Sequence, residues 1–96
     1  MRKVLIRPRA DADLEGIWLY TLETWSEEQA SRCLRQLDEA IQLLATDPRR
    51  GKDRREIAPG YFSIHVGRHV VFYTFTDEMA GVERMLHDQM DIPRHF

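Results

Sequence analysis

The first half of the chain repeats its apolar positions at the spacing of an α-helix. A short apolar segment at residues 4–6 predicts a strand, and Pro8 then suits the first turn of a helix. Positions three and four residues apart form one face at Leu14, Ile17, Trp18, Thr21, Leu22 and Trp25. A second face follows at Ala30, Cys33, Leu34, Leu37, Ile41 and Leu44. This spacing predicts one helix beginning at Pro8 and another running from Ser26 to near Thr46.

The sequence Ser-Glu-Glu-Gln at residues 26–29 predicts the start of the second helix. In this capping box the Ser26 hydroxyl accepts a hydrogen bond from the Gln29 backbone N–H, and the Gln29 side chain reaches back to the cap. Glu28 and Arg32 are four residues apart, which predicts a favourable pair on the outer face of the helix. Because almost no residues separate the two helices, we expect them to form a tight helical hairpin.

The second half of the chain changes to the two-residue period of β-strands. Residues 61–66 and 69–75 flank a Gly-Arg pair, which predicts a β-hairpin with Gly67 at positive φ. A third strand is expected at residues 82–87. The predicted register pairs Val66 with His69, Ile64 with Val71 and Phe62 with Tyr73. One face of the hairpin is therefore almost entirely apolar and is expected to cover a core.

The order strand, helix, helix, strand, strand, strand predicts an α+β fold. In this fold an N-terminal strand and a three-stranded antiparallel meander form one small sheet, and the helical hairpin packs on one face of it. A length of 96 residues predicts a single domain that spans residues 1–96.

Composition narrows the functional classes. The chain is 43% hydrophobic and 31% charged, with a formal net charge of −2, which excludes a disordered chain and argues against a dedicated nucleic-acid binder. Cys33 is the single cysteine, so an internal disulfide cannot form, and no segment resembles a signal peptide or a membrane span. These features favour a cytoplasmic protein without a membrane role.

Recognisable catalytic and cofactor motifs are absent from the sequence. No Gly-rich phosphate loop, Cys-x-x-Cys, His-Glu-x-x-His or Gly-x-Ser-x-Gly occurs, and no cofactor is expected. The predicted register places His65 and His69 on opposite faces of the sheet, which argues against a shared metal ion. Cys33 lies on the apolar face of the second helix, where a structural role is favoured over a nucleophilic one.

Residues 47–60 predict a loop, because they hold two prolines, two glycines and several basic side chains. The basic residues are Arg49, Arg50, Lys52, Arg54 and Arg55. With Asp53 among them, they give residues 49–55 a net charge of 5 − 1 = +4. This run either contacts phosphates or an acidic partner, or forms a solvated loop, and the acidic charge of the whole chain favours the second interpretation.

Basic and imidazole side chains also gather toward the C-terminus at Arg84, His87, Arg94 and His95. Such groups can move protons and stabilise phosphorane charge during RNA cleavage. Histidines that simply form hydrogen bonds are the favoured alternative, because the spacing does not require catalysis.

The first helix carries more apolar surface than one sheet can bury. Residues 17–20 read Ile-Trp-Leu-Tyr, so apolar or aromatic side chains cover more than half of the helix circumference. An exposed apolar patch on a small protein usually marks a partner site. The alternative is that Leu19 and Tyr20 line the contact with the second helix, and the sequence does not decide between the two.

Five segments of the sequence form an ordered pattern that spans nearly the whole chain. They are Pro8-x-Ala10-x-x-Asp13-Leu14-x-x-Ile17-x-x-Tyr20, Gln29-Ala30, Leu44-Ala45-x-x-Pro48-x-x-Gly51, Gly67-x-His69-Val70-Val71-Phe72-Tyr73 and Arg84-Met85-Leu86-His87-x-x-Met90-Asp91-x-x-Arg94-His95-Phe96. This pattern resembles the ParE branch of the ParE/RelE superfamily of toxins from bacterial toxin-antitoxin systems. The resemblance implies the RelE/ParE-like fold, neutralisation by a ParD-like antitoxin in a hetero-oligomer, and DNA gyrase as the target.

The resemblance also implies an alternative, because the RelE branch cuts mRNA on the ribosome. In that alternative Arg68 or Arg84 stabilises phosphate charge and His87 acts as acid or base. The chain departs from the pattern, since Tyr61-Phe62-Ser63 stands where an arginine is common and no tyrosine follows Asp91. A degenerate member that has lost its toxicity is a third possibility.

We therefore expect a non-enzymatic interaction protein with no catalytic residues, no metal site and no sequence-specific DNA binding of its own. The residues expected to receive the antitoxin are Trp18, Leu19 and Tyr20. The residues expected to take part in toxicity are Arg84, His87, Met90, Asp91, Arg94 and His95.

Overall fold

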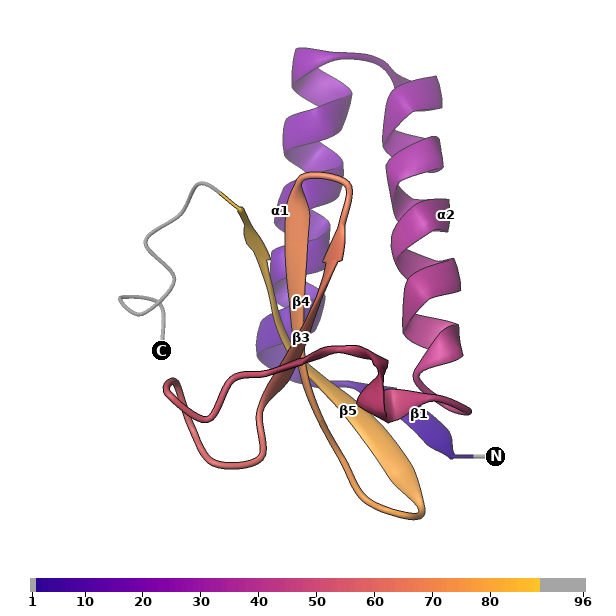
Figure 1. The fold of residues 1–96 in the computed structure, drawn as a ribbon. Helices are drawn as coiled ribbons and strands as arrows, with labels where there is room; N and C mark the ends of the chain where they lie inside the picture. Colours follow the sequence, from indigo (N-terminus) through magenta and orange to yellow (C-terminus); the bar gives the residue numbers. More distant parts are fainter. Residues whose placement is uncertain (1, 89–96) are drawn as a thin grey trace.

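A computed structural model describes residues 2–88, which form a five-stranded sheet with two helices on one face (Figure 1). The elements are β1 (Lys3–Ile6), α1 (Pro8–Thr24), α2 (Glu27–Leu43), a 3-10 turn (Pro48–Arg50), β2 (Lys52–Asp53), β3 (Phe62–Val66), β4 (His69–Phe75) and β5 (Met79–His87). The order across the sheet is β1-β5-β4-β3-β2, and only the β1–β5 pair is parallel. The predicted α+β fold is confirmed.

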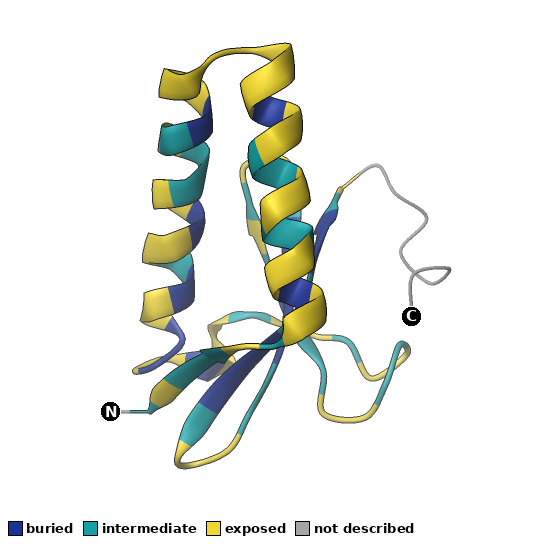
Figure 2. Cartoon of the chain, turned by 180° about the vertical axis from the view of Figure 1, so that it is seen from behind, coloured by how far each residue is buried: buried dark blue, intermediate teal, exposed yellow. Residues whose placement is uncertain are grey.

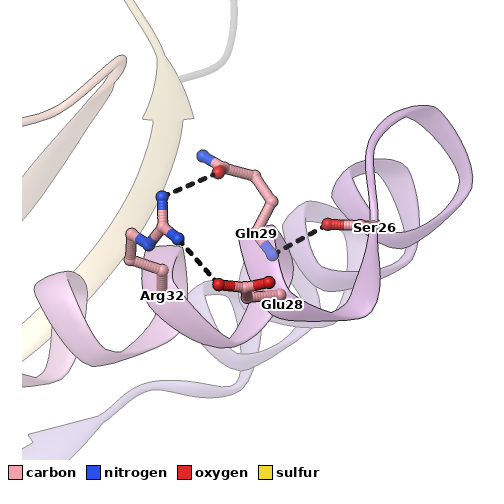
Figure 3. Close-up of polar contacts among 4 residues, drawn as sticks. All are labelled: Ser26, Glu28, Gln29 and Arg32. Carbon is pink, nitrogen blue, oxygen red and sulfur yellow. Dashed lines mark hydrogen bonds and ion pairs between the residues drawn. The ribbon is translucent and has the colours of Figure 1, made fainter.

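The start of α2 forms much as the sequence predicts (Figure 3). Ser26 Oγ accepts a hydrogen bond from the Gln29 backbone N–H at 3.1 Å, which satisfies one of the unpaired donors of the first turn. The Gln29 side chain differs from the prediction, because its Oε1 accepts from Arg32 Nη1 at 3.3 Å. Arg32 Nη2 also lies 3.2 Å from Glu28 Oε1, which confirms the predicted pair.

The β3–β4 hairpin has the predicted register. Val66 lies opposite His69, and Gly67 adopts a φ of 61° in the turn. The pairing continues to Phe62 and Tyr73 without a shift. Because side chains alternate along a strand, His65 and His69 point to opposite faces of the sheet, as predicted.

Strand β5 begins earlier than predicted and contains an irregularity. It starts at Met79 instead of residue 82, because β1 pairs with its first half from Lys3 opposite Met79 to Ile6 opposite Val82. The register with β4 then shifts between Phe72 and Tyr73, so that one extra residue is inserted in β5. The shift brings Val82 and Met85, which are three residues apart, into the same core.

The prediction of a loop over residues 47–60 is wrong at its start, where the 3-10 turn and β2 form. The Tyr73 hydroxyl organises this segment: it donates to the Pro48 carbonyl at 2.6 Å and accepts from the Gly51 N–H at 3.1 Å. Gly51 permits the close approach, because a Cβ there would collide with the Tyr73 hydroxyl and lie 2.6 Å from the Ser63 carbonyl oxygen. The sequence shows the turn-forming residues but not the distant tyrosine that orders them.

Apolar side chains are buried on both faces of the sheet. The helix-facing core contains Ala10, Leu37, Ile41, Val71, Val82 and Met85. Figure 2 shows the corresponding pattern, with buried positions on the inner side of each helix and exposed positions outside. On the opposite face, Ile57 and Tyr61 pack on a smaller cluster formed by Val70, Phe72 and Leu86. The segment after β2 therefore acts as a cover for that face.

The two helices extend past the β3–β4 turn, so their joined ends have no sheet beneath them (Figures 1 and 2). The apolar face expected on the first helix is therefore only partly buried in this last part. Trp25 is 72% exposed and Leu22 is also exposed, whereas Thr21 is buried. Within residues 2–88, neither helix is long and apolar enough to span a lipid bilayer.

We predict that Tyr73→Phe lowers the free energy of unfolding by about 1–3 kcal/mol, because the Pro48 carbonyl and the Gly51 N–H lose their buried partner. Urea denaturation followed by circular dichroism measures the change. Tyr20→Phe is the matched control, since Tyr20 is exposed and removal of its hydroxyl should leave stability nearly unchanged. Equal effects of the two substitutions would contradict the role assigned to Tyr73.

Candidate functional site

A groove of about 680 Å³ lies between α1 and the outer edge of β5. It exists because β1 ends at Ile6, opposite Val82, so β5 continues to His87 without a neighbouring strand on that side. Helix α1 runs along this open edge. The groove is lined from α1 by Ala12, Asp13, Gly16, Ile17 and Tyr20, and from the sheet by His69, Arg84, Met85, Leu86 and His87.

Asp13 joins α1 to β5 within this groove. Its Oδ2 accepts from Arg84 Nε at 2.7 Å and from the Met85 backbone N–H at 3.0 Å, while its Oδ1 accepts from Arg84 Nη2 at 3.1 Å. The two side chains are only 12% and 17% exposed. The hydrogen bond to Asp13 raises the pKa of Arg84 above its ordinary value, so the guanidinium stays charged. One carboxylate thus satisfies a strand edge and a cation together.

A second hollow of about 510 Å³, which we call the upper hollow, lies between the projecting ends of the helices and the β3–β4 turn. Its walls include Trp25 just after α1, Cys33 from α2 and Arg68 from the turn. Tyr20, His69 and His87 line both the hollow and the α1–β5 groove, so the two surfaces meet at these residues. The result is a continuous, mainly apolar recess beside the exposed part of α1.

Histidine side chains mark the place where the groove and the hollow meet. The ring centres of His69 and His87 are 5.6 Å apart, and the rings lie edge to face. Burial and the neighbouring His87 lower the pKa of His69 below its ordinary value, and Asp88 opposes this effect. Asp88 Oδ1 lies 3.4 Å from His87 Nδ1, and its Oδ2 lies 3.2 Å from His65 Nε2.

The three residues expected to receive an antitoxin occupy different positions on α1. Tyr20 lines both parts of the recess and is 64% exposed. Trp18 is half-buried and does not line the recess, and Leu19 is 48% exposed. At 100° per residue, Leu19 points nearly opposite to the buried Thr21 side of the helix. The structure therefore brings Tyr20 together with Trp25 in the recess, although Trp25 was not among the residues expected to receive an antitoxin.

The residues of the ribonuclease alternative all line the recess, and His87 belongs to both of its parts. Arg68 and His87 line the upper hollow, whereas Arg84 and His87 line the α1–β5 groove. Arg84 is also engaged by Asp13 through two of its nitrogens. The remaining residues expected to take part in toxicity lie outside the described part of the chain: Met90, Asp91, Arg94 and His95.

The basic run at residues 49–55 is divided among several local contacts. Arg54 Nε donates to Ser63 Oγ at 2.8 Å, so this part of the run packs on the sheet instead of forming a fully solvated loop. Arg55 pairs with Asp53 at 2.9 Å, and its hydrogen bonds lower the pKa of that carboxyl. The central carbon of the Arg49 guanidinium lies over the Phe75 ring, 5.4 Å from the ring centre. The other four basic residues of the run are exposed, as the favoured interpretation of a solvated segment predicts: Arg49, Arg50, Lys52 and Arg55.

Little in the described residues points to nucleophilic or metal chemistry. Cys33 is half-buried, and burial raises the pKa of its thiol, which makes the reactive thiolate less available. Between residues 2 and 88, no group of three or more histidine, cysteine or acidic side chains is arranged to hold a metal ion.

The sequence analysis missed Asp13 and His69 as residues of this site. Asp13 was noted only as part of the family pattern, and no local spacing reveals a partner 71 residues away. His69 had a usable signal, because its predicted pairing with Val66 already placed it on the helix-facing side of the sheet.

We predict that Asp13→Asn lowers the free energy of unfolding by about 3 kcal/mol, because the largely buried Arg84 guanidinium loses its carboxylate. Glu28→Gln is the matched control, since it removes an exposed helix pair and should cost less than about 0.5 kcal/mol. Chemical denaturation of both variants measures the difference. A loss in Asp13→Asn no larger than that in the control would show that the Asp13 contacts do not stabilise the fold.

Comparison with known proteins places this arrangement in a family. The sequence profile described as the ParE toxin of the type II toxin-antitoxin system, parDE, matches residues 4–92. The chain is 42% identical over 95 residues to Toxin ParE1 of Mycobacterium tuberculosis, a match that covers 98% of this chain and 97% of that protein. It is 34% identical over 96 residues to Toxin ParE1 of Caulobacter vibrioides, covering 100% and 99% of the two chains.

Solved structures show the same fold at low sequence identity. A chain from a chromosomal ParDE toxin-antitoxin system of P. aeruginosa superposes with a TM-score of 0.78 at 17% identity, covering 91% of this chain and 96% of that one. A chain from the E. coli DinJ-YafQ toxin-antitoxin complex gives a TM-score of 0.63 at 15% identity, covering 90% and 91%. The profile match and the sequence relatives show that this chain belongs to the ParE family of toxins from type II toxin-antitoxin systems.

Proposed function

We propose that this ParE-family toxin acts in the cytoplasm as a non-catalytic inhibitor of DNA gyrase and is neutralised by a ParD-like antitoxin. The observation that carries the antitoxin part is the apolar recess beside the projecting end of α1. Tyr20 and Trp25 line it and are exposed in the isolated chain. The ParDE and DinJ-YafQ assemblies among the structural neighbours support a partner of this kind.

The shape of the recess suits an amphipathic segment. Apolar side chains such as Ile17 and Met85 line the α1–β5 groove, while its charged pair, Asp13 and Arg84, is internally neutralised. A segment laid in this groove can bury apolar area without leaving a lining charge unpaired, which is the usual basis of helix-in-groove recognition. Covering Tyr20 and Trp25 would also remove the largest exposed aromatic surface of α1 from water.

Gly16 gives separate support for a partner in the α1–β5 groove. It lies in the middle of α1 and lines the groove, where a glycine costs about 1 kcal/mol relative to alanine. No atom lies within 4 Å of the position that its Cβ would occupy, so packing within the described chain does not require glycine. A partner that approaches the α1 backbone closely at this point supplies a reason for it.

We predict that the double substitution Tyr20→Ala and Trp25→Ala weakens antitoxin binding at least about tenfold, equivalent to about 1.4 kcal/mol. Both side chains line the recess, and buried aromatic residues dominate the energetics of such interfaces. Isothermal titration calorimetry with the antitoxin encoded by the neighbouring gene measures the change. Leu43→Ala is the control, because Leu43 is also exposed but lies near the other end of α2, outside the recess.

Retained affinity in the folded double variant would show that the antitoxin binds elsewhere. A loss of similar size in Leu43→Ala would show that the effect is not local to the recess. Circular dichroism of each variant establishes that the helices are intact before affinities are compared.

The gyrase part of the proposal is supported by family membership. The non-catalytic part is supported by the ion pair that engages Arg84, one of the two candidate phosphate-binding residues, with Asp13. We expect expression without the antitoxin to arrest growth, and the purified chain to inhibit supercoiling by gyrase in a gel assay. Unchanged supercoiling at saturating protein would remove gyrase as the target, and normal growth would indicate a member that has lost its toxicity. Cleavage of mRNA in a translating extract that disappears in a folded His87→Ala variant would instead favour the endoribonuclease alternative.

A further inference from the structure

His69 and His87 lie where the two parts of the recess that we assign to the antitoxin meet. Both side chains are partly buried, their rings are 5.6 Å apart, and both line the groove as well as the upper hollow. A segment that passes from one part of the recess to the other must cross these two rings. Whatever side chain it places there meets imidazole nitrogens on β4 and β5.

The charge of the recess favours an acidic side chain at this crossing. The upper hollow is lined by one fixed charge, that of Arg68, and by no carboxylate from the described residues. In the groove, the Asp13 carboxylate is already bonded to Arg84 and to the Met85 N–H. The recess therefore offers a partner one fixed cation, Arg68, although the chain as a whole has a net charge of −2.

Protonation of His69 is disfavoured in the isolated chain. Burial and the adjacent His87 lower its pKa, His65 on β3 acts weakly in the same direction, and Asp88 acts in the opposite direction. Arg68 in the turn is a further cation beside the same hollow, and Tyr20 faces it from α1 as a neutral group. A carboxylate brought close to the ring would favour the imidazolium and raise this pKa.

We propose that His69 and His87 form a proton-linked receptor for a carboxylate of the antitoxin, so that the complex tightens as the pH falls. This inference rests on the proposed function and adds to it the charge of the bound segment and the regulation of binding. The sign follows from linkage: a histidine whose pKa is higher in the complex than in the free chain takes up a proton on binding. Each unit by which the antitoxin raises the pKa of His69 contributes up to about tenfold in affinity.

The test measures the dissociation constant of the full chain and the antitoxin from the neighbouring gene between about pH 8 and about pH 6, where histidine titrates. The wild-type complex should tighten by about tenfold across this range. His69→Asn, which keeps a polar side chain but cannot titrate there, should lose most of that dependence. His65→Asn is the matched control, because His65 also contacts Asp88 but lies on the other face of the sheet and does not line the recess.

Nuclear magnetic resonance titration of the His69 ring gives a second, direct readout, and its pKa should rise when the antitoxin binds. Antitoxin binding that does not vary with pH, or a dependence that His69→Asn retains, overturns this inference and leaves the proposed function standing. An unchanged His69 pKa in the complex overturns it as well. Absence of antitoxin binding at every pH overturns the inference together with the antitoxin part of the proposed function.

Discussion

The position of α1, and with it the candidate site, depends on how β5 satisfies the hydrogen bonds of its outer edge. Strand β1 pairs with the first half of that edge and ends opposite Val82. Beyond this point the Met85 N–H would face an apolar helix, where an unpaired donor is costly, and Asp13 accepts it. Because Asp13 also binds Arg84, the start of α1 is fixed against the strand while its far end remains uncovered. The groove between them follows from this attachment at one end.

Elements governed by neighbours in sequence could be predicted, and those governed by distant residues could not. The helical hairpin and the turn at Gly67 follow from apolar spacing, a capping serine and one glycine at positive φ. Strand β2 depends on Tyr73, which bonds to Gly51 across 22 residues, so the local sequence shows only turn-forming residues. A strict two-residue period also does not predict the extra residue in β5, although this residue places Val82 and Met85 in the same core.

The candidate site was predictable in kind but not in detail. An excess of apolar residues on the first helix indicated a partner surface, and Tyr20 does line the recess. The sequence could not show where the sheet ends beneath α1, and this decides that Trp25 is exposed whereas Thr21 is buried. It also could not bring His87 beside His69, because the pairing of β4 with β5 had no turn of fixed length to set its register.

The parallel pairing of β1 with β5 has a consequence for how this chain folds during synthesis. Lys3 pairs with Met79, so β1 has no partner during synthesis until β5 has emerged from the ribosome. Contacts between such distant residues form late, after the entropy of closing a long loop has been overcome. The α1–β5 groove cannot exist before that closure, since β5 forms one of its walls. Nascent chains that stop short of β5 thus lack both the completed sheet and the groove that we propose as part of the antitoxin surface.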